Sequence, residues 1–130
     1  MYLLDTSAII EVFENTVLGK SIAEYIKDKP FVVCSLTLYE LGKKKNPSPK
    51  LLYFIRNLKF IAIDDQAATE ASGIFRTLRD NRKSINEFDL LIAASALSKN
   101  MELVTSDSDF ILIRKFSDLK LYYFGKKKYG

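Results

Sequence analysis

Short apolar runs alternate with helix-like segments along this chain. The apolar runs favour extended structure, and we predict that each forms a strand. They comprise residues 2–4, Phe31–Cys34, Phe60–Ile63, Glu102–Val104 and Leu119–Phe124. Continuously apolar strands separated by helices are typical of a parallel sheet covered on both faces, so the pattern predicts an α/β fold with a mostly parallel sheet of about five strands.

Polar residues ahead of three helix-like segments predict where those helices begin. Ser35 precedes LTLYELGKK, and Asn86 precedes EFDLLIAASALSK. Either Asp64 or Asp65 opens QAATEASGIFRTLRD. All of these residue types are acceptable helix N-caps.

The chain is predicted to form one domain, because no repeat or long linker divides it. We place this domain at residues 1–125 and a flexible basic tail at residues 126–130. Pro47 and Pro49 are expected only to separate two helices. The segment Leu51–Leu58 is more apolar than one buried helix face needs. Core packing is the favoured explanation, and a surface for a partner protein is the alternative.

The composition restricts the possible chemistry. Twenty Lys and Arg residues against 16 Asp and Glu residues give a net charge of +4, which suits a polyanionic partner. The chain has no histidine, which excludes Ser-His-Asp and Cys-His catalysis. A single cysteine, Cys34, excludes an internal disulfide and a Cys/His zinc site, and its apolar surroundings predict a buried thiol. Because no apolar stretch is long enough for a membrane span, we expect a soluble, cytoplasmic protein with no membrane partner.

Four acidic residues stand out by their positions. Asp5 follows the first predicted strand, and Asp107 follows the fourth. Glu40 lies within SLTLYELGK, and Asp89 precedes an almost wholly apolar run. Each also has a purely structural explanation: a turn or cap for the two strand-end acids, an ion pair with Lys44 for Glu40, and helix capping for Asp89.

Taken together, these acids favour a metal site. Ligands of open α/β sheets bind outside the carboxyl ends of the strands, and several carboxylates gathered there repel one another unless a cation neutralises them. Mg²⁺ and Mn²⁺ prefer oxygen ligands and commonly bridge to phosphates. An acidic cluster in a mildly basic protein without histidine is therefore suited to metal-assisted hydrolysis of phosphodiesters.

Four segments of the chain, in order, resemble the signature segments of PIN-domain ribonucleases, especially the VapC toxins of prokaryotic toxin–antitoxin pairs. They are LLDTSAIIE, SLTLYELGK, INEFDLLIAASAL and LVTSDSDF. The resemblance implies a three-layer α/β/α sandwich, cleavage of RNA that depends on Mg²⁺ or Mn²⁺, a VapB-type antitoxin and a homodimer. It also identifies Asp5, Glu40, Asp89 and Asp107 as the catalytic, metal-binding acids.

The same resemblance assigns auxiliary roles near these acids. A hydroxyl after the first acid falls on Thr6 or Ser7, and Thr105 precedes the last acid. Asp109 is the alternative to Asp107 as the fourth acid; Asp107 is preferred because it lies nearer the strand end. Glu87 is at best auxiliary, because residues two apart do not share a helix face with each other.

Basic residues are candidates for contacts with RNA phosphates. The spacing of Arg76, Arg79 and Arg82, with Lys83, predicts a basic side of one long helix, and a merely solvated face is an equal alternative. Lys43–Lys45 are expected at a helix end, where cations are favourable. Lys126–Lys128 in the tail are further candidates.

Other functions fit the sequence less well. A haloacid-dehalogenase-like phosphatase needs a second acid two residues after Asp5, where this chain has Ser7. A receiver domain needs paired acids at the first strand end. A PIN-like module that binds RNA or a protein without cleaving it is the remaining alternative, and it does not need all four acids.

Overall fold

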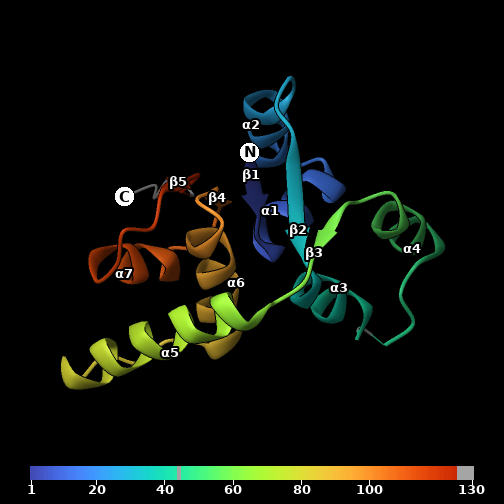
Figure 1. Cartoon of the computed structure of the whole chain (residues 1–130). Coiled ribbons are helices and arrows are strands. Elements are labelled where there is room, and N and C mark those ends of the chain that lie inside the picture. The colour runs from blue at the N-terminus through green and yellow to red at the C-terminus, as the bar shows by residue number, and fades with distance from the viewer. Residues whose placement is uncertain (44, 126–130) are drawn as a thin grey trace.

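The computed structural model describes residues 1–43 and 45–125, and Figure 1 shows how their helices and strands are arranged. The predicted tail at 126–130 and the expected Glu40–Lys44 pair therefore lie outside the described residues. The elements follow one another as β1 (Tyr2–Leu4), α1 (Thr6–Glu14), α2 (Val17–Ile26), β2 (Phe31–Cys34), α3 (Ser35–Gly42), α4 (Pro49–Arg56), β3 (Phe60–Ile61), α5 (Asp65–Asp80), α6 (Glu87–Ser98), β4 (Glu102–Thr105), α7 (Asp109–Lys115) and β5 (Leu121–Tyr123).

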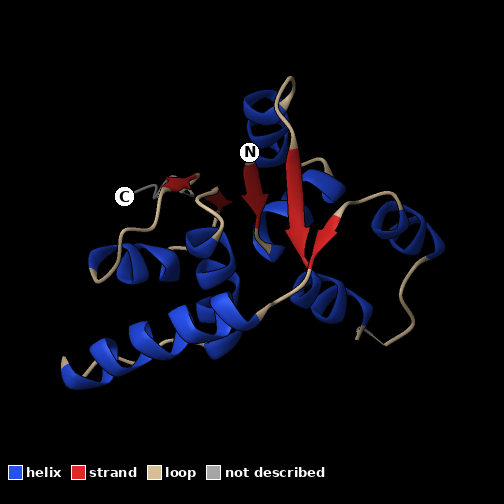
Figure 2. Cartoon of the chain, in the orientation of Figure 1, coloured by secondary structure: helices blue, strands red, loops and turns tan. Residues whose placement is uncertain are grey.

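The strands form one five-stranded sheet in the order β3-β2-β1-β4-β5, and every described pairing is parallel. The arrowheads of β1, β2 and β3 point the same way in Figure 2. Strand β1 lies at the centre of the sheet. Strand β2, the next along the chain, lies on one side of it, and β4 lies on the other side. The strand order thus reverses between β1 and β4, which is the usual place for a ligand crevice.

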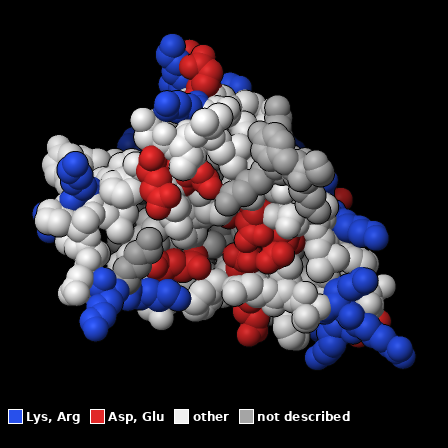
Figure 3. All heavy atoms as spheres, turned by 180° about the vertical axis from the view of Figure 1, so that it is seen from behind, with Lys and Arg blue, Asp and Glu red and all other residues white. Residues whose placement is uncertain are grey.

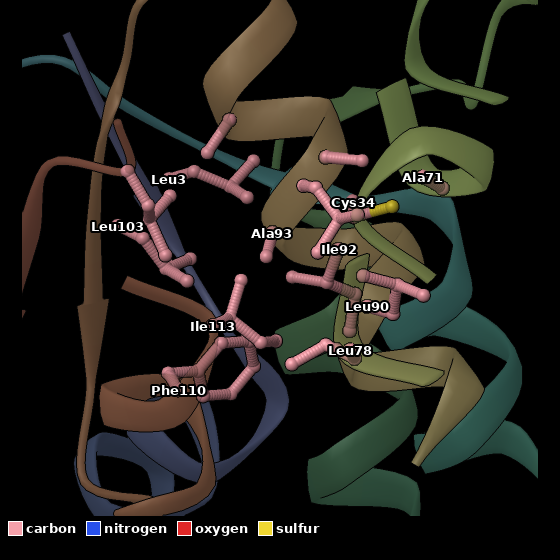
Figure 4. Close-up of a cluster of buried hydrophobic side chains, with 14 of the residues drawn as sticks. Leu3, Cys34, Ala71, Leu78, Leu90, Ile92, Ala93, Leu103, Phe110 and Ile113 are labelled. Atoms are coloured by element: carbon pink, nitrogen blue, oxygen red, sulfur yellow. The ribbon is translucent and has the colours of Figure 1, made fainter. Parts of the chain in front are cut away.

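Successive residues of the strands point to opposite faces, and each face carries its own core. Leu3, Val32 and Leu103 join one buried cluster, while their neighbours Leu4, Val33 and Val104 join the other. The first cluster is completed by α5, α6 and α7 (Figure 4), and the second by α1, α2 and α4. This confirms the predicted three-layer α/β/α fold.

Two predicted strands are shorter in the structure than in the sequence pattern. The third ends at Ile61 rather than Ile63, because Ile61 pairs with Cys34, the last residue of β2 before α3 begins. The fifth covers only Leu121–Tyr123, the residues that pair with 103–105 of β4. The fourth extends by one residue, to Thr105.

Asn86 and Asp64 cap their helices as predicted, each accepting hydrogen bonds from backbone N–H groups of the first turn. The prediction for Ser35 was wrong. Strand β2 passes directly into α3, so that Cys34 occupies the cap position without a side-chain hydrogen bond and Ser35 is already helical. Pro49 starts α4 rather than merely breaking the chain, with Ser48 as its cap.

The helical hairpin of α1 and α2 depends on a glycine. A Cβ atom added to Gly19 would lie 1.9 Å from the carbonyl oxygen of Glu11, so no other residue fits this close approach of the two backbones.

Within α4, Leu51 and Ile55 are buried as expected of core residues, but Leu52 and Tyr53 are exposed. Cys34 is a buried free thiol, as predicted. No helix in the described part of the chain is long and apolar enough to cross a membrane.

Candidate active site

Acidic residues from four separate segments gather at the carboxyl ends of β1 and β4. Asp5 follows β1, Glu40 lies in α3, Asp89 lies in the first turn of α6, and Asp107 and Asp109 follow β4. We call these five residues the acidic edge. It lies where the strand order reverses, so the fold itself brings together acids as far apart in the sequence as Asp5 and Asp109.

Asp5 is held more firmly than the other acids. It is 3% exposed, and one oxygen of its carboxylate accepts a hydrogen bond from the N–H of Ala8 at 3.0 Å. The hydroxyl of Ser7 donates to the same oxygen at 2.9 Å, and Thr105 donates to the other oxygen, also at 2.9 Å. Burial nevertheless outweighs these hydrogen bonds and raises the pKa of Asp5 to about 6.

The structure also settles which residue caps α1. Asp5 is the N-cap, which is the structural explanation that the sequence offers for this acid. Its backbone is extended and its side chain accepts from the first turn, as a cap requires. The structural and functional interpretations of Asp5 are therefore compatible, because one carboxylate serves both.

A chain of hydroxyl groups fixes Glu40. Thr6 donates a hydrogen bond to a carboxylate oxygen of Glu40 at 2.6 Å, and the hydroxyls of Thr6 and Thr37 are 2.9 Å apart. Because the proton of Thr6 points to Glu40, Thr37 must be the donor to Thr6. Thr37 is fully buried and was not predicted as part of the site. Its position three residues before Glu40, on the same side of α3, was the only signal in the sequence.

Asp89 is the most perturbed acid of the acidic edge. Two effects together raise its pKa to about 7. The larger is its partial burial, and the second is the negative charge of the other four acids, Asp107, Asp5, Glu40 and Asp109. A carboxylate that merely capped α6 would be favoured by the positive end of the helix, and its pKa would fall. The pKa of Asp89 shifts in the opposite direction, because burial first and the neighbouring carboxylates second disfavour its charged form.

Asp107 and Asp109 both approach Asp89. One carboxylate oxygen from each of the three residues lies within 4.8 Å of the other two. The N–H of Asp107 donates to Thr105 Oγ1 at 2.9 Å, and the N–H of Asp109 donates to the Asp107 carboxylate at 2.9 Å. The turn after β4 therefore brings both Asp107 and Asp109 near Asp89.

The donor set fits a hard divalent cation. Ligand oxygens on one octahedral Mg²⁺ ion with bonds of about 2.1 Å lie at most about 4.2 Å from one another. Three carboxylate oxygens within 4.8 Å of one another are near enough to share such an ion. In the described part of the chain, the one ion pair joins Lys99 to Asp64, so none of these acids is neutralised by a side-chain ion pair. Figure 3 shows Asp and Glu side chains gathered near the middle of one face, with most Lys and Arg side chains toward its outline.

The basic residues are arranged differently from the prediction. Arg76 and Arg79 are exposed on α5, but this helix ends at Asp80, so Arg82 and Lys83 do not continue its basic side. Arg82 adopts a left-handed backbone conformation (φ 57°), which turns the chain away from the helix. Likewise α3 ends at Gly42, so that Lys43 is its C-cap and Lys45 lies beyond the helix.

A family model described as PIN domain matches residues 2–115 of the chain. The chain belongs to the PIN-domain family. The resemblance seen in the four signature segments is thereby confirmed, and all five residues of the acidic edge lie within those segments. A search of curated proteins found no match.

Solved structures show the same fold. VapBC2 from Rickettsia felis, bound to a DNA fragment from its promoter, has a chain that matches with a TM-score of 0.78 and 23% identity, over 94% of this chain and 97% of that one. DNA-bound VapBC from Salmonella typhimurium gives a TM-score of 0.76 and 21% identity, over 95% and 97% of the two chains. FitAB bound to a DNA fragment gives 0.73 and 16% identity over the whole of both chains.

Proposed function

We propose that this PIN domain is a metal-dependent endoribonuclease that hydrolyses RNA phosphodiester bonds, and that it is the toxin of a toxin–antitoxin pair. The observation that carries the proposal is the approach of Asp89, Asp107 and Asp109 to one another, with no ion pair to them from any described lysine or arginine. Such an arrangement costs free energy in the absence of a cation, so it is hard to explain by stability alone.

Asp89, Asp107 and Asp109 would hold Mg²⁺ or Mn²⁺, and the carboxylates of Asp5 and Glu40 add negative charge beside them. When bound, the cation supplies Lewis-acid stabilisation of the charge that develops on a phosphodiester during hydrolysis. Thr105 and Ser7 keep the Asp5 carboxylate in one orientation. Thr6 and Thr37 do the same for Glu40. With no histidine in the chain, acids and hydroxyls are the polar groups that this site offers.

The proposed toxin role rests on the assemblies in which proteins of similar fold are found. The Rickettsia and Salmonella structures are VapBC assemblies, and another neighbour is described as a toxin–antitoxin complex from Klebsiella pneumoniae. By analogy we propose a VapB-type antitoxin as partner and a homodimer of this chain. The exposed apolar side chains of Leu38, Leu52 and Tyr53 on α3 and α4 offer a surface for such a partner.

Cleavage of several single-stranded RNAs with Mg²⁺, with Mn²⁺ and with a chelator tests the proposal. The unmutated protein should cleave only with a cation, and Asp89→Asn and Asp5→Asn should not cleave although circular dichroism shows them folded. Asp28→Asn is the matched control, because Asp28 is an exposed acid ahead of β2, at the other end of the sheet.

Two results would overturn the proposal. Full cleavage by both Asp→Asn variants of the acidic edge would disprove the site. Absence of cleavage by the unmutated protein on every RNA, together with RNA binding, would favour the non-cleaving binding module.

A further inference from the structure

Two aromatic rings stand beside the acidic edge, on the two helices that supply Glu40 and Asp89. Tyr39 precedes Glu40 in α3, and Phe88 precedes Asp89 in α6. Their ring centroids are 5.8 Å apart and their planes meet at 85°. Adjacent positions on a helix point about 100° apart, so these rings flank the carboxylates instead of joining them.

This pair is more open than a core contact would be. The Tyr39 side chain is 54% exposed, and Phe88 is half-buried. Rings at right angles form a corner, in which a third flat group can stack on one ring while its edge meets the other. The pair therefore offers a free aromatic surface next to the acids.

A cation completes the corner. Lys43 Nζ lies 5.4 Å from the centroid of the Tyr39 ring and 6.0 Å from that of the Phe88 ring. Lys43 is exposed at the end of α3, one turn after Tyr39. An exposed ammonium group that lies over two ring faces is able to turn to a phosphate. The acidic edge itself repels a polyanion, so a cation at its rim matters for substrate approach.

We infer that Tyr39, Phe88 and Lys43 form a nucleobase subsite, in which a base of single-stranded RNA next to the cleaved phosphodiester stacks on Tyr39 while Lys43 contacts the backbone. The inference rests on the proposed ribonuclease function. Proteins that bind single-stranded RNA commonly stack splayed bases on aromatic side chains and follow the backbone with cations. The corner combines both elements, with its rings one residue from Glu40 and from Asp89 and its cation three residues after Glu40.

Binding of a short, fluorescently labelled single-stranded RNA, measured by anisotropy in the Asp89→Asn background, tests the subsite without cleavage. Tyr39→Ala should weaken binding about tenfold, whereas Tyr39→Phe and Tyr39→Trp should retain it because each keeps a stacking face. Val17→Ala is the control, since Val17 is 83% exposed at the start of α2, outside the corner. In the cleaving protein, Tyr39→Ala should raise KM and change kcat little.

A series of RNAs with one base removed at a time separates stacking from a general structural effect. One abasic position should weaken binding to the Tyr39 protein as much as Tyr39→Ala does, and it should cause no further loss in Tyr39→Ala. The subsite is overturned if Tyr39→Ala binds normally, if its loss is independent of every abasic position, or if Tyr39→Ala affects only the binding of an antitoxin.

The two proposals fail in different ways. Cleavage with normal RNA binding by Tyr39→Ala overturns the subsite alone. RNA binding that depends on Tyr39 and on one base, without any cleavage, overturns the ribonuclease function but supports a base-binding corner. A protein that neither binds nor cleaves RNA overturns both.

Discussion

Glu102 and Asp107 lie near the two ends of the same strand, β4, and the structure surrounds their carboxylates in opposite ways. Glu102 at the start of the strand accepts a hydrogen bond from the phenol of Tyr25 at 2.6 Å. Tyr25 in turn packs against the rings of Tyr2, Tyr122 and Phe124, which together we call the aromatic cluster. Asp107, beyond the other end, lies among carboxylates of the acidic edge.

The two ends of β4 therefore differ in how the surroundings of their carboxylates affect stability. In the aromatic cluster, burial and the neighbouring Glu102 raise the pKa of Tyr25, so the phenol remains a hydrogen-bond donor and Glu102 keeps its partner. At the acidic edge the neighbours of Asp89 are like charges, and its pKa rises to about 7. One end provides a hydrogen-bond donor for a carboxylate, whereas the other gathers several carboxylates that no described lysine or arginine pairs with, as expected of a cation site.

The variant Asp89→Asn should have the largest effect of the changes that test this comparison. This change should lower RNA cleavage about 100-fold or more, because it removes a carboxylate from the three that approach one another. The free energy of unfolding in chelator should not fall, since a source of repulsion is removed. Initial cleavage rates measure the loss of activity, and urea unfolding in chelator measures the free energy of unfolding. A variant with lost activity and lost stability would indicate a structural role instead.

Stability without metal should depend on pH in a direction set by the acidic edge. The folded state keeps protons on Asp5 up to about pH 6 and on Asp89 up to about pH 7, whereas the unfolded chain releases them near their ordinary values of 3.8. The free energy of unfolding therefore falls as pH rises between these values. For Asp5 the difference corresponds to about 3 kcal/mol.

Urea unfolding in chelator at about pH 5 and about pH 8 measures this dependence. Asp5→Asn should reduce it, because an amide has no proton to release and Asn is also a good N-cap. An unchanged pH dependence in Asp5→Asn would show that the burial of this carboxylate has no thermodynamic consequence.

Thr37→Val tests whether hydroxyls at the acidic edge act by orientation. Valine has nearly the same shape, but it cannot donate to Thr6, which holds Glu40. We expect cleavage to fall about tenfold, in line with the loss of partners behind other metal ligands. Thr37→Ser should restore the rate. Equal rates in Thr37→Val and the unmutated protein would contradict the role.

Tyr25→Phe should have the smallest effect and only on stability. It removes the phenol that donates to Glu102 but keeps the ring contacts of the aromatic cluster. The free energy of unfolding should fall by about 1 kcal/mol, and RNA cleavage should stay unchanged. Lost cleavage in this variant would mean that the two ends of β4 are coupled.

Much of this account follows from short sequence patterns. The apolar runs place the strands, because strands of a parallel sheet are buried on both faces. The acids Asp5 and Asp107 were predicted at the site because parallel strands end at one edge. Glu40 and Asp89 also stand out by their positions in the sequence, and the family segments imply the same role for them. The structure places both near the other two acids.

The remaining features depend on contacts that no local pattern encodes. Thr37 belongs to the site only because α1 brings Thr6 to α3. Asp109 joins Asp107 because the turn after β4 points both toward Asp89. The end of α5 at Asp80 rests on the left-handed conformation of Arg82, and that residue type seldom adopts it.

Calorimetric titration with Mn²⁺ at about pH 8, where Asp89 is ionised, tests most directly whether the acidic edge is a cation site. The unmutated protein and Asp28→Asn should bind Mn²⁺ with the same affinity, and Asp89→Asn should bind it at least about tenfold more weakly. Equal Mn²⁺ binding by all three proteins, or no binding by any of them, would contradict the assignment.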